Sequence, residues 1–386
     1  MKYLLGSILL FIVFSCGKKS TESTPDSQSV LDFKAIAELI IGQADLHPGE
    51  KVLLVINPGR FDPLVEHLKT AIVEKEAVYL GTESLGKSNN KDWNTGYVQG
   101  LQNIAGDELR NYLKEVDLGI MLPGATPIDI VYDGLQKVLQ LGMGRTIHFH
   151  WQGAYDLNGN AFEPDSALDQ FYQRVLFDTD YAALATKHEA FEQSMRNNWV
   201  RVTTPAGTDI KFQIGDRQVT RQDGNASMAK MKNARTLIDR EVELPAGAIR
   251  VAPMEESVEG IIAFPDAKWN EQMATGVRVT ISGGKVLDVK ADSNLEAVMA
   301  ELEGGGEAAE SFREFALGFN PLLAIPEENP WIPYYGYGAG VVRLSLGDNT
   351  ELGGNVKGGY VRWNFFTDAT VTVGDEVWVQ DGKLIK

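Results

Sequence analysis

The sequence from Gly338 to Phe366, GAGVVRLSLGDNTELGGNVKGGYVRWNFF, contains two mostly apolar runs separated by a segment rich in glycine, asparagine and aspartate. The runs at 341–346 and 360–366 have the length and composition of strands, and turn residues connect them, so the stretch predicts a strand–turn–strand unit. Each strand contains one arginine, Arg343 in the first and Arg362 in the second. A buried arginine is costly unless it is paired, so the two arginines predict a polar site with a carboxylate nearby.

The second half of the chain contains five distinctive short segments. They are PAGTDI (205–210), LPAGAIRVAP (244–253) with SVEG (257–260), REFALG (313–318) with Asn320-Pro321, and the two strands VRLSLGDN (342–349) and YVRWNFF (360–366). These segments occur in the order found in the aminopeptidase T family of thermophilic metallopeptidases. Residues 204–366 therefore resemble this family, and the first half of the chain fits it in outline.

In the aminopeptidase T family these segments supply a catalytic tyrosine and the ligands of a two-metal centre. By position, the resemblance places the tyrosine at Thr350 and the ligands at Ala248, Glu314, Gly338, Arg343, Arg362 and Asn364. Of these ligand positions only Glu314 is acidic, and no histidine follows His188 in the chain. A guanidinium group stays protonated and cannot ligate a metal. The resemblance therefore implies the scaffold of the family without its metal centre, and we expect no cofactor.

The charged residues that remain at these positions, Glu314, Arg343 and Arg362, allow two interpretations. In the first, the carboxylate and the two guanidinium groups form a structural cluster. In the second, these residues and Asn364 bind a peptide-like or other anionic ligand without cleaving it, because arginine matches carboxylates with two parallel hydrogen bonds. Both interpretations predict that the two arginines lie close to each other and to Glu314.

A competing hypothesis retains catalysis. The protein would then be an active aminopeptidase that releases N-terminal residues from peptides, with zinc, cobalt or manganese held by relocated ligands. The acidic residues available for such a set are Glu314, Asp348, Glu351 and Asp368. The metal content of the purified protein distinguishes the two hypotheses.

A second candidate site is the sequence His148-Phe149-His150. The alternating spacing places both imidazoles on one face of a strand, which is a possible beginning of a metal site. No cysteine, aspartate or glutamate lies close in sequence to complete it, although ligands can come from distant segments. The sequence therefore favours a structural pair of histidines.

The N-terminus has the pattern of a bacterial lipoprotein. Lys2 precedes an apolar run, 3–14, that is too short to span a bilayer. Ser15 and then Cys16, the only cysteine in the chain, follow this run. A lone thiol at that position predicts a lipid acceptor, with residues 1–16 as the signal peptide and the polar residues 17–29 as a tether. The alternative is a plain secretory signal with an incidental cysteine. We expect an extracytoplasmic protein that is anchored to the bacterial membrane through Cys16.

The rest of the chain predicts two domains. Strand-like runs alternate with amphipathic helices over residues 30–165, which indicates an α/β domain with a doubly wound, mostly parallel sheet. Residues 166–198 are typical of a helical linker with a break near Asp178. Residues 199–386 predict an α+β domain with a largely antiparallel sheet, including two helices at 295–302 and 307–316.

Composition limits the possible partners. The chain has 386 residues, of which 44% are hydrophobic and 23% charged, as expected for a globular protein. Its formal net charge of −17 argues against a nucleic-acid partner. The aromatic segment 331–337 is suited to lining a ligand cleft or to packing at a subunit interface. The family resemblance implies a homodimer.

Overall fold

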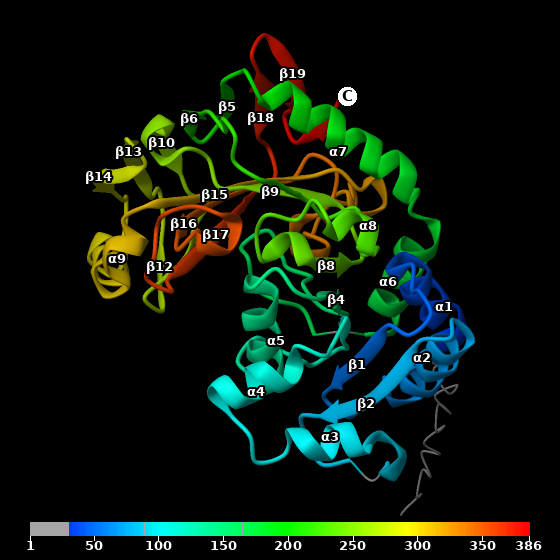
Figure 1. Cartoon of the computed structure of the whole chain (residues 1–386). Helices are drawn as coiled ribbons and strands as arrows, with labels where there is room; N and C mark the ends of the chain where they lie inside the picture. The colour runs from blue at the N-terminus through cyan, green and yellow to red at the C-terminus, as the bar shows by residue number, and fades with distance from the viewer. Residues whose placement is uncertain (1–30, 89, 164) are drawn as a thin grey trace, which may run out of the picture.

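The computed structural model describes residues 31–386 with the exception of residues 89 and 164 (Figure 1). The predicted signal peptide, the tether and Cys16 lie outside the described residues. Within the described part of the chain, no helix combines the length and the apolar character that a membrane span requires.

The N-terminal half is built around a parallel sheet of five strands in the order β2-β1-β3-β4-β8. The side chains of β1 alternate between two hydrophobic clusters, with Val52 and Leu54 in one and Leu53 and Val55 in the other. This strand is therefore buried on both faces, as its continuous apolar sequence predicts. The strands are β1 (Lys51–Ile56), β2 (Val78–Ser84), β3 (Leu118–Met121), β4 (Arg145–Phe149) and β8 (Glu241–Leu244).

Helices cover both faces of this sheet, so the predicted doubly wound α/β architecture is confirmed (Figure 1). Apolar residues of α1 and α2 pack in one hydrophobic cluster, and those of α3, α4 and α5 pack in the other. The helices are α1 (Phe33–Ala44), α2 (Asp62–Glu74), α3 (Gly96–Leu101), α4 (Gly106–Leu113) and α5 (Ile130–Gln140).

Two consecutive helices, α6 (Ser166–Asp178) and α7 (Tyr181–Met195), connect the parallel sheet to the antiparallel half. They meet at the break that the sequence predicts near Asp178. Phe191 of α7 packs against Phe319 and Trp378, with ring centroids 5.4 and 4.8 Å apart. The helical segment is thus part of the core of the C-terminal half.

The C-terminal half is antiparallel, as predicted, but its strands form two large sheets and a two-stranded one in place of the single sheet expected. Of the two large sheets, the larger has the order β14-β13-β10-β6-β5-β18-β19-β20, and the smaller has the order β17-β16-β15-β9-β7. The larger sheet consists of β5 (Val200–Thr203), β6 (Asp209–Phe212), β10 (Glu259–Ala263), β13 (Arg278–Ser282), β14 (Lys285–Lys290), β18 (Thr370–Val373), β19 (Glu376–Gln380) and β20 (Lys383–Leu384). The smaller sheet consists of β7 (Val219–Arg221), β9 (Ala248–Val251), β15 (Phe312–Gly318), β16 (Val342–Gly347) and β17 (Val361–Phe366).

Smaller elements complete this half. Helix α9 contacts the short hairpin of β11 and β12 and the strands β14, β16 and β17. These elements are α8 (Met228–Met231), α9 (Leu295–Ala309), β11 (Ala267–Trp269) and β12 (Gln272–Ala274).

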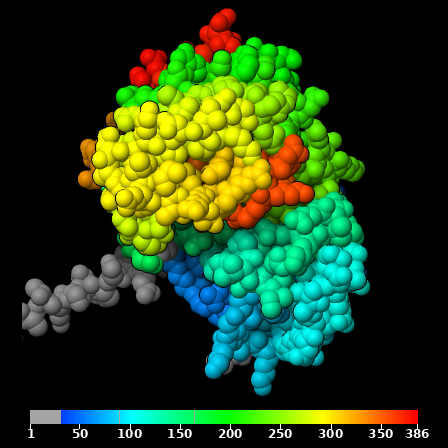
Figure 2. Space-filling model, turned by 90° about the vertical axis from the view of Figure 1, so that its left-hand side faces the viewer, coloured from blue at the N-terminus to red at the C-terminus, as the bar shows by residue number. Residues whose placement is uncertain are grey.

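One strand from the second half of the sequence belongs to the parallel sheet of the first half. Strand β8 lies within the segment 199–386 that the sequence assigns to the C-terminal domain, yet it pairs in parallel with β4. One hydrophobic cluster also runs through both halves, from α1 to β19. Figure 2 shows the two halves in contact, with yellow and orange segments of the antiparallel half above cyan segments of the parallel half.

The prediction of a helix at 307–316 is wrong from residue 312 onward. Residues 312–318 form β15, the central strand of the smaller sheet, and all seven are buried. A short apolar run that is buried on both faces has no period that distinguishes a strand from a buried helix. The error matters because Glu314 lies on this strand.

Candidate functional site

Glu314 lies on the central strand of the smaller sheet between two arginines. Ala316 of β15 is directly opposite Arg343 of β16 and Arg250 of β9, and Glu314, two residues earlier, shares their face. Arg250 donates from Nε and Nη2 to the two carboxylate oxygens at 2.9 Å each, and Arg343 donates from Nη2 at 2.7 Å. The structure thus brings Glu314 and Arg343 together as expected and adds Arg250, which the sequence analysis missed.

The arrangement keeps the Glu314 carboxylate ionised. Its side chain is 1% exposed. Burial alone would raise the pKa of this carboxyl, but the positive charges of Arg250 and Arg343 outweigh burial and hold the pKa well below its ordinary value of 4.5. A buried carboxylate that is paired in this way is stable only while its cations remain.

A β-bulge extends the cluster. The pairing of β15 with β16 shifts register between Phe312 and Glu314, and such a bulge turns a side chain away from its regular direction. The Nε of Arg313 consequently lies 3.3 Å from Glu314, and its Nη2 donates to Glu351. The Nη2 of Arg250 also donates to Glu351, at 2.9 Å. We call Arg250, Arg313, Arg343, Glu314 and Glu351 the arginine cluster; it has one more positive than negative charge.

Arg362 does not belong to the arginine cluster, so the predicted grouping of Arg343, Arg362 and Glu314 is wrong. Arg343 is opposite Phe365, whereas Arg362 is opposite Leu346, three residues after Arg343. Residues directly opposite share a face, and an odd separation along a strand changes the face, so the two arginines point to opposite sides of the sheet.

Arg362 has its own partners on that other side. Its Nη1 donates to Glu301 of α9 at 2.6 Å, and its guanidinium lies 3.4 Å from the ring centroid of Trp269. Arg362 and Asn364 line a separate cavity of 420 Å³. The two residues are therefore not ligand-binding candidates for the site around Glu314.

The positions that the resemblance assigns to a metal centre do not fit two metal ions. Glu314 is already bonded to two guanidinium groups, and Arg343 stands at a position where the family has a histidine. A side chain at Gly338 would place its Cβ 1.8 Å from the carbonyl oxygen of Leu323, so no ligand can replace this glycine without rearrangement. Ala248 is a buried strand residue, and the hydroxyl of Thr350 bonds to Asp348 in a surface turn.

The relocated ligand set of the competing hypothesis is not assembled either. Asp348 accepts hydrogen bonds from the backbone of Thr350, Gly358 and Gly359, so it stabilises a turn. Asp368 is exposed, and Glu351 is bonded to arginines. Of the residues that the structure describes, one group of three histidines or acidic residues has the spacing of a metal site, and it lies elsewhere.

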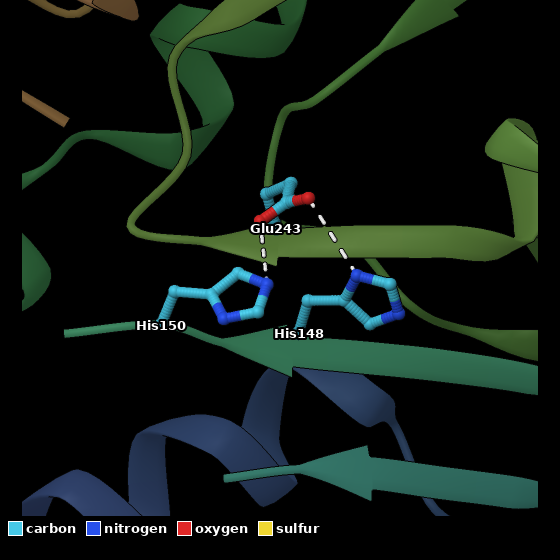
Figure 3. Close-up of side chains that lie close together, drawn as sticks. All are labelled: His148, His150 and Glu243. Atoms are coloured by element: carbon cyan, nitrogen blue, oxygen red, sulfur yellow. Dashed lines mark ion pairs between the residues drawn. The ribbon is translucent and has the colours of Figure 1, made fainter. Parts of the chain in front are cut away.

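This group forms where the parallel strands β4 and β8 run side by side. Ile147 pairs with Val242 and His148 with Glu243, so the alternating sequences His-Phe-His and Glu-Val-Glu place their polar side chains on the same face. The Nδ1 of His148 lies 3.6 Å from Glu243, and the Nε2 of His150 lies 3.8 Å from the same carboxylate. We call His148, His150 and Glu243 the histidine–glutamate group (Figure 3).

The structure therefore supplies the acidic partner that the sequence analysis did not find for His148 and His150. Glu243 is distant in sequence and becomes a neighbour only because β8 pairs with β4. The available signal was the alternation of Glu241 and Glu243 around one apolar residue, which matches the alternation of the histidines. Interpreting it required the order of the strands in the sheet.

Other polar groups surround the histidine–glutamate group. The hydroxyl of Tyr132 lies 2.9 Å from Nδ1 and 3.1 Å from Nε2 of His148, and the Oγ1 of Thr146 lies 3.1 Å from Nε2. Glu241 lies 3.7 Å from the same Nε2. The hydroxyl of Tyr334 donates to Glu243 at 3.2 Å.

Burial and neighbouring charges shift the pKa values of these side chains, in several cases in opposite directions. Burial lowers the pKa of His150 to about 4, which keeps this imidazole neutral. Burial raises the pKa of Glu241 to about 7. Burial would also raise the pKa of Glu243, but the neighbouring His150 and His148 lower it to about 2. Burial lowers the pKa of His148, but Glu241 and Glu243 outweigh it and raise this pKa above its ordinary value.

A cavity of 370 Å³ separates the arginine cluster from the histidine–glutamate group. It opens at the carboxyl ends of β3, β4 and β8, the edge at which open α/β sheets bind ligands. The wall on the parallel side includes Thr126, Tyr132, Gln136, His148, His150 and Glu243, and the opposite wall includes Arg250, Arg313, Arg343, Glu351, Tyr335 and Trp363. The aromatic segment 331–337 thus contributes Tyr335 and Tyr337 to a cleft, which is one of the two roles expected for it.

Arg343 is incompletely paired on this wall, as is Arg313, whose buried Nε also has no hydrogen-bond partner among the described residues. Apart from Glu314, the one other hydrogen bond of Arg343 is a long one of 3.4 Å from Nη1 to the carbonyl of Tyr335, and its buried Nε has no partner among the described residues. Its guanidinium lies 5.2 Å from the ring centroid of Trp363. Because a guanidinium has five N–H donors, Arg343 retains capacity for a further acceptor.

The chain is similar to known proteins in its fold, but comparisons by sequence find no match. No protein-family model matches the chain, and no curated protein matches it by sequence. Among solved structures, 2,5-dihydroxypyridine dioxygenase from Pseudomonas putida KT2440 is similar with a TM-score of 0.59 and 14% identity, over 92% of this chain and 96% of that chain. Wild-type AmpT from Thermus thermophilus is similar with a TM-score of 0.58 and 14% identity, over 92% of this chain and 99% of that chain. The chain therefore has the aminopeptidase T-like fold.

Proposed function

We propose that the protein binds a small carboxylate-bearing ligand, such as the C-terminus of a short peptide, in the cavity between its two halves. The observation that carries this proposal is the incomplete pairing of Arg343 on the wall of a 370 Å³ cavity. A charged donor with unused N–H groups in a partly buried site is suited to an anionic acceptor. The excess positive charge of the arginine cluster supports the same ligand class.

The cavity has the other features of a small-molecule site. Tyr335, Tyr337 and Trp363 supply apolar surface beside the charged groups, and the volume is within the usual range for ligand pockets. Aromatic walls would exclude water from an ion pair between ligand and arginine and so strengthen it.

We do not propose peptide hydrolysis at the family metal positions. Arginine occupies a ligand position there, and Gly338 leaves no room for an acidic side chain. The fold does not decide the reaction, because one similar structure is described as a dioxygenase and the other as AmpT. The binding role therefore depends on the cavity alone.

We further propose that the protein acts outside the cytoplasm, anchored to the membrane by a lipid on Cys16. The apolar run that ends two residues before this single cysteine supports the proposal. A carboxylate ligand such as a peptide would then be met in the periplasm or at the cell surface.

Calorimetric titration of the full-length protein with trialanine, trialanine amide and glutarate tests the binding proposal. We expect at least one of the two carboxylates, trialanine or glutarate, to bind. We expect Arg343→Met to weaken that binding by about ten- to a hundredfold, since a hydrogen bond to a charged group contributes about 1.5–3 kcal/mol. Trialanine amide should bind correspondingly less tightly than trialanine.

Arg201→Met is the matched control, because the exposed side chain of Arg201 pairs with that of Asp209 and neither residue lines the cavity. This variant should bind like the wild type. If neither carboxylate binds, or if binding is the same with and without Arg343, the proposed function is wrong.

A further inference from the structure

We propose that His148, His150 and Glu243 form a binding site for one divalent transition-metal ion. The site goes beyond the proposed ligand binding and does not depend on it. It uses none of the positions that the aminopeptidase T family uses for metals. It also departs from our expectation, based on those positions, that the protein has no cofactor.

The spacing of the three side chains is the first argument. The distances from Glu243 to the imidazole nitrogens, 3.6 and 3.8 Å, are too long for hydrogen bonds. Two ligands on one tetrahedral ion, each at about 2.0–2.1 Å from the metal, lie about 3.4 Å apart. All three ligand atoms already lie within 4.8 Å of one another. A small inward movement of the side chains would therefore close the group around an ion.

The unsatisfied nitrogens of His150 are the second argument. Its Nδ1 is buried and has no partner, and its Nε2 has only the 3.8 Å approach to Glu243 among the described residues. Buried polar atoms in folded proteins almost always have a partner. A metal ion on Nε2 would give that nitrogen the partner that Glu243, at 3.8 Å, does not supply, and Nδ1 would stay free of the ion.

The surroundings are the third argument, because they orient the ligands as the second shell of a metal site does. Thr146 and Glu241 lie next to the Nε2 of His148, whereas its Nδ1 lies 3.6 Å from Glu243. The hydroxyl of Tyr132, 2.9 Å from this Nδ1, would have to give up that contact when an ion binds. A carboxylate such as that of Glu241 beside a ligating histidine fixes the ring and raises its basicity. The hydroxyl of Tyr334 similarly holds one oxygen of Glu243.

The donor set selects the class of ion. Two imidazoles and one carboxylate suit zinc, iron, cobalt or nickel, whereas calcium and magnesium prefer sites made of oxygen atoms. Three protein ligands leave at least one coordination position open. His150 and Glu243 are 12% and 14% exposed and line the 370 Å³ cavity, so the open position faces the proposed ligand site.

The competing interpretation is a structural cluster in which the three side chains keep these positions without an ion. It predicts no metal binding, and metal titration therefore decides between them. The full-length protein, freed of metal with a chelator, should bind one zinc ion per chain in calorimetry. One cobalt ion should produce the strong visible absorption of a four- or five-coordinate site.

Two substitutions identify the ligands. His150→Ala and Glu243→Gln should each lower zinc affinity by more than about 100-fold, because losing a ligand costs more than losing a residue that only holds a ligand in place. His67→Ala is the matched control, since His67 is exposed on α2, and it should leave the affinity unchanged. Glu243→Gln retains the shape of the side chain, so it remains informative if His150→Ala does not fold.

Stoichiometric binding that either ligand substitution abolishes supports the site. Absence of zinc and cobalt binding, or binding that both substitutions leave intact, overturns it. These outcomes are distinct from those for the proposed function, because they use the metal alone and do not involve Arg343 or a carboxylate ligand.

Discussion

Removing the carboxylate of Glu314 should destabilise the protein more than almost any other single charge change. Glu314→Ala deletes three hydrogen bonds, two from Arg250 and one from Arg343, at a residue with a side chain that is 1% exposed. Arg250 would retain Glu351, but Arg343 would be left with the 3.4 Å contact to Tyr335. Breaking a buried ion pair in this way costs about 3–5 kcal/mol, because a charge remains without a partner.

The effect of the unpaired charge on stability can be separated from the effect of lost packing. Replacing the whole unit with Glu314→Leu, Arg250→Met and Arg343→Met leaves no orphan charge, and apolar replacement of buried ion clusters is often neutral or stabilising. We expect the triple variant to be more stable than Glu314→Ala despite its additional substitutions.

Urea denaturation followed by tryptophan fluorescence measures both variants against the wild type. Glu256→Ala is the control, because Glu256 is exposed and surface changes of this kind usually alter stability by less than about 0.5 kcal/mol. A loss below about 1 kcal/mol in Glu314→Ala would refute the reasoning, and so would a triple variant that is as unstable as the single one.

Three further predictions concern pH, the second arginine and the anchor. The folded-state pKa of Glu314 lies well below its ordinary value of 4.5, so its stabilisation should be complete above about pH 4.5 and decrease as the pH falls below it. The stability difference between wild type and Glu314→Gln, measured by urea denaturation from pH 7 to pH 3, should shrink only in the acid range; a constant difference would contradict this. Arg362→Met removes the 2.6 Å ion pair with Glu301 and the contact with Trp269, and should cost about 2 kcal/mol without changing carboxylate binding in calorimetry. A loss of binding in this variant would show that the face assignment is wrong. Cys16→Ser should move the protein from the membrane fraction to the soluble fraction or leave its signal peptide uncleaved, as seen by immunoblotting; wild-type protein that is itself soluble and without lipid would disprove the anchor.

Local pattern was sufficient to predict the class of fold of this protein. The alternation of apolar strands and amphipathic helices predicts the doubly wound parallel sheet, and the turn-rich connection in 338–366 predicts the hairpin of β16 and β17. Both signals depend on residues that are close in sequence, where periodicity and turn chemistry act directly on the backbone. The likeness to aminopeptidase T could be recognised for the same reason, because its motifs are short and occur in a fixed order.

The candidate sites depended on tertiary structure. Arg343 and Arg362 separate because the register between β16 and β17 places them an odd number of residues apart, and a shift of one residue changes the face of every side chain. Arg250 reaches Glu314 because residues 312–318 form a central strand, although the predicted element was a helix. A short apolar segment contains no local information on that choice.

The histidine–glutamate group shows most clearly that local sequence does not reveal which distant residues meet. The two alternating sequences, His148-Phe149-His150 and Glu241-Val242-Glu243, are visible in the chain, but nothing local indicates that they are neighbours. They become neighbours because β8 crosses back from the C-terminal half to pair with β4. The sequence by itself determined the residue types and their faces. The order of the strands in the sheet, which depends on packing between distant segments, decided which residues meet.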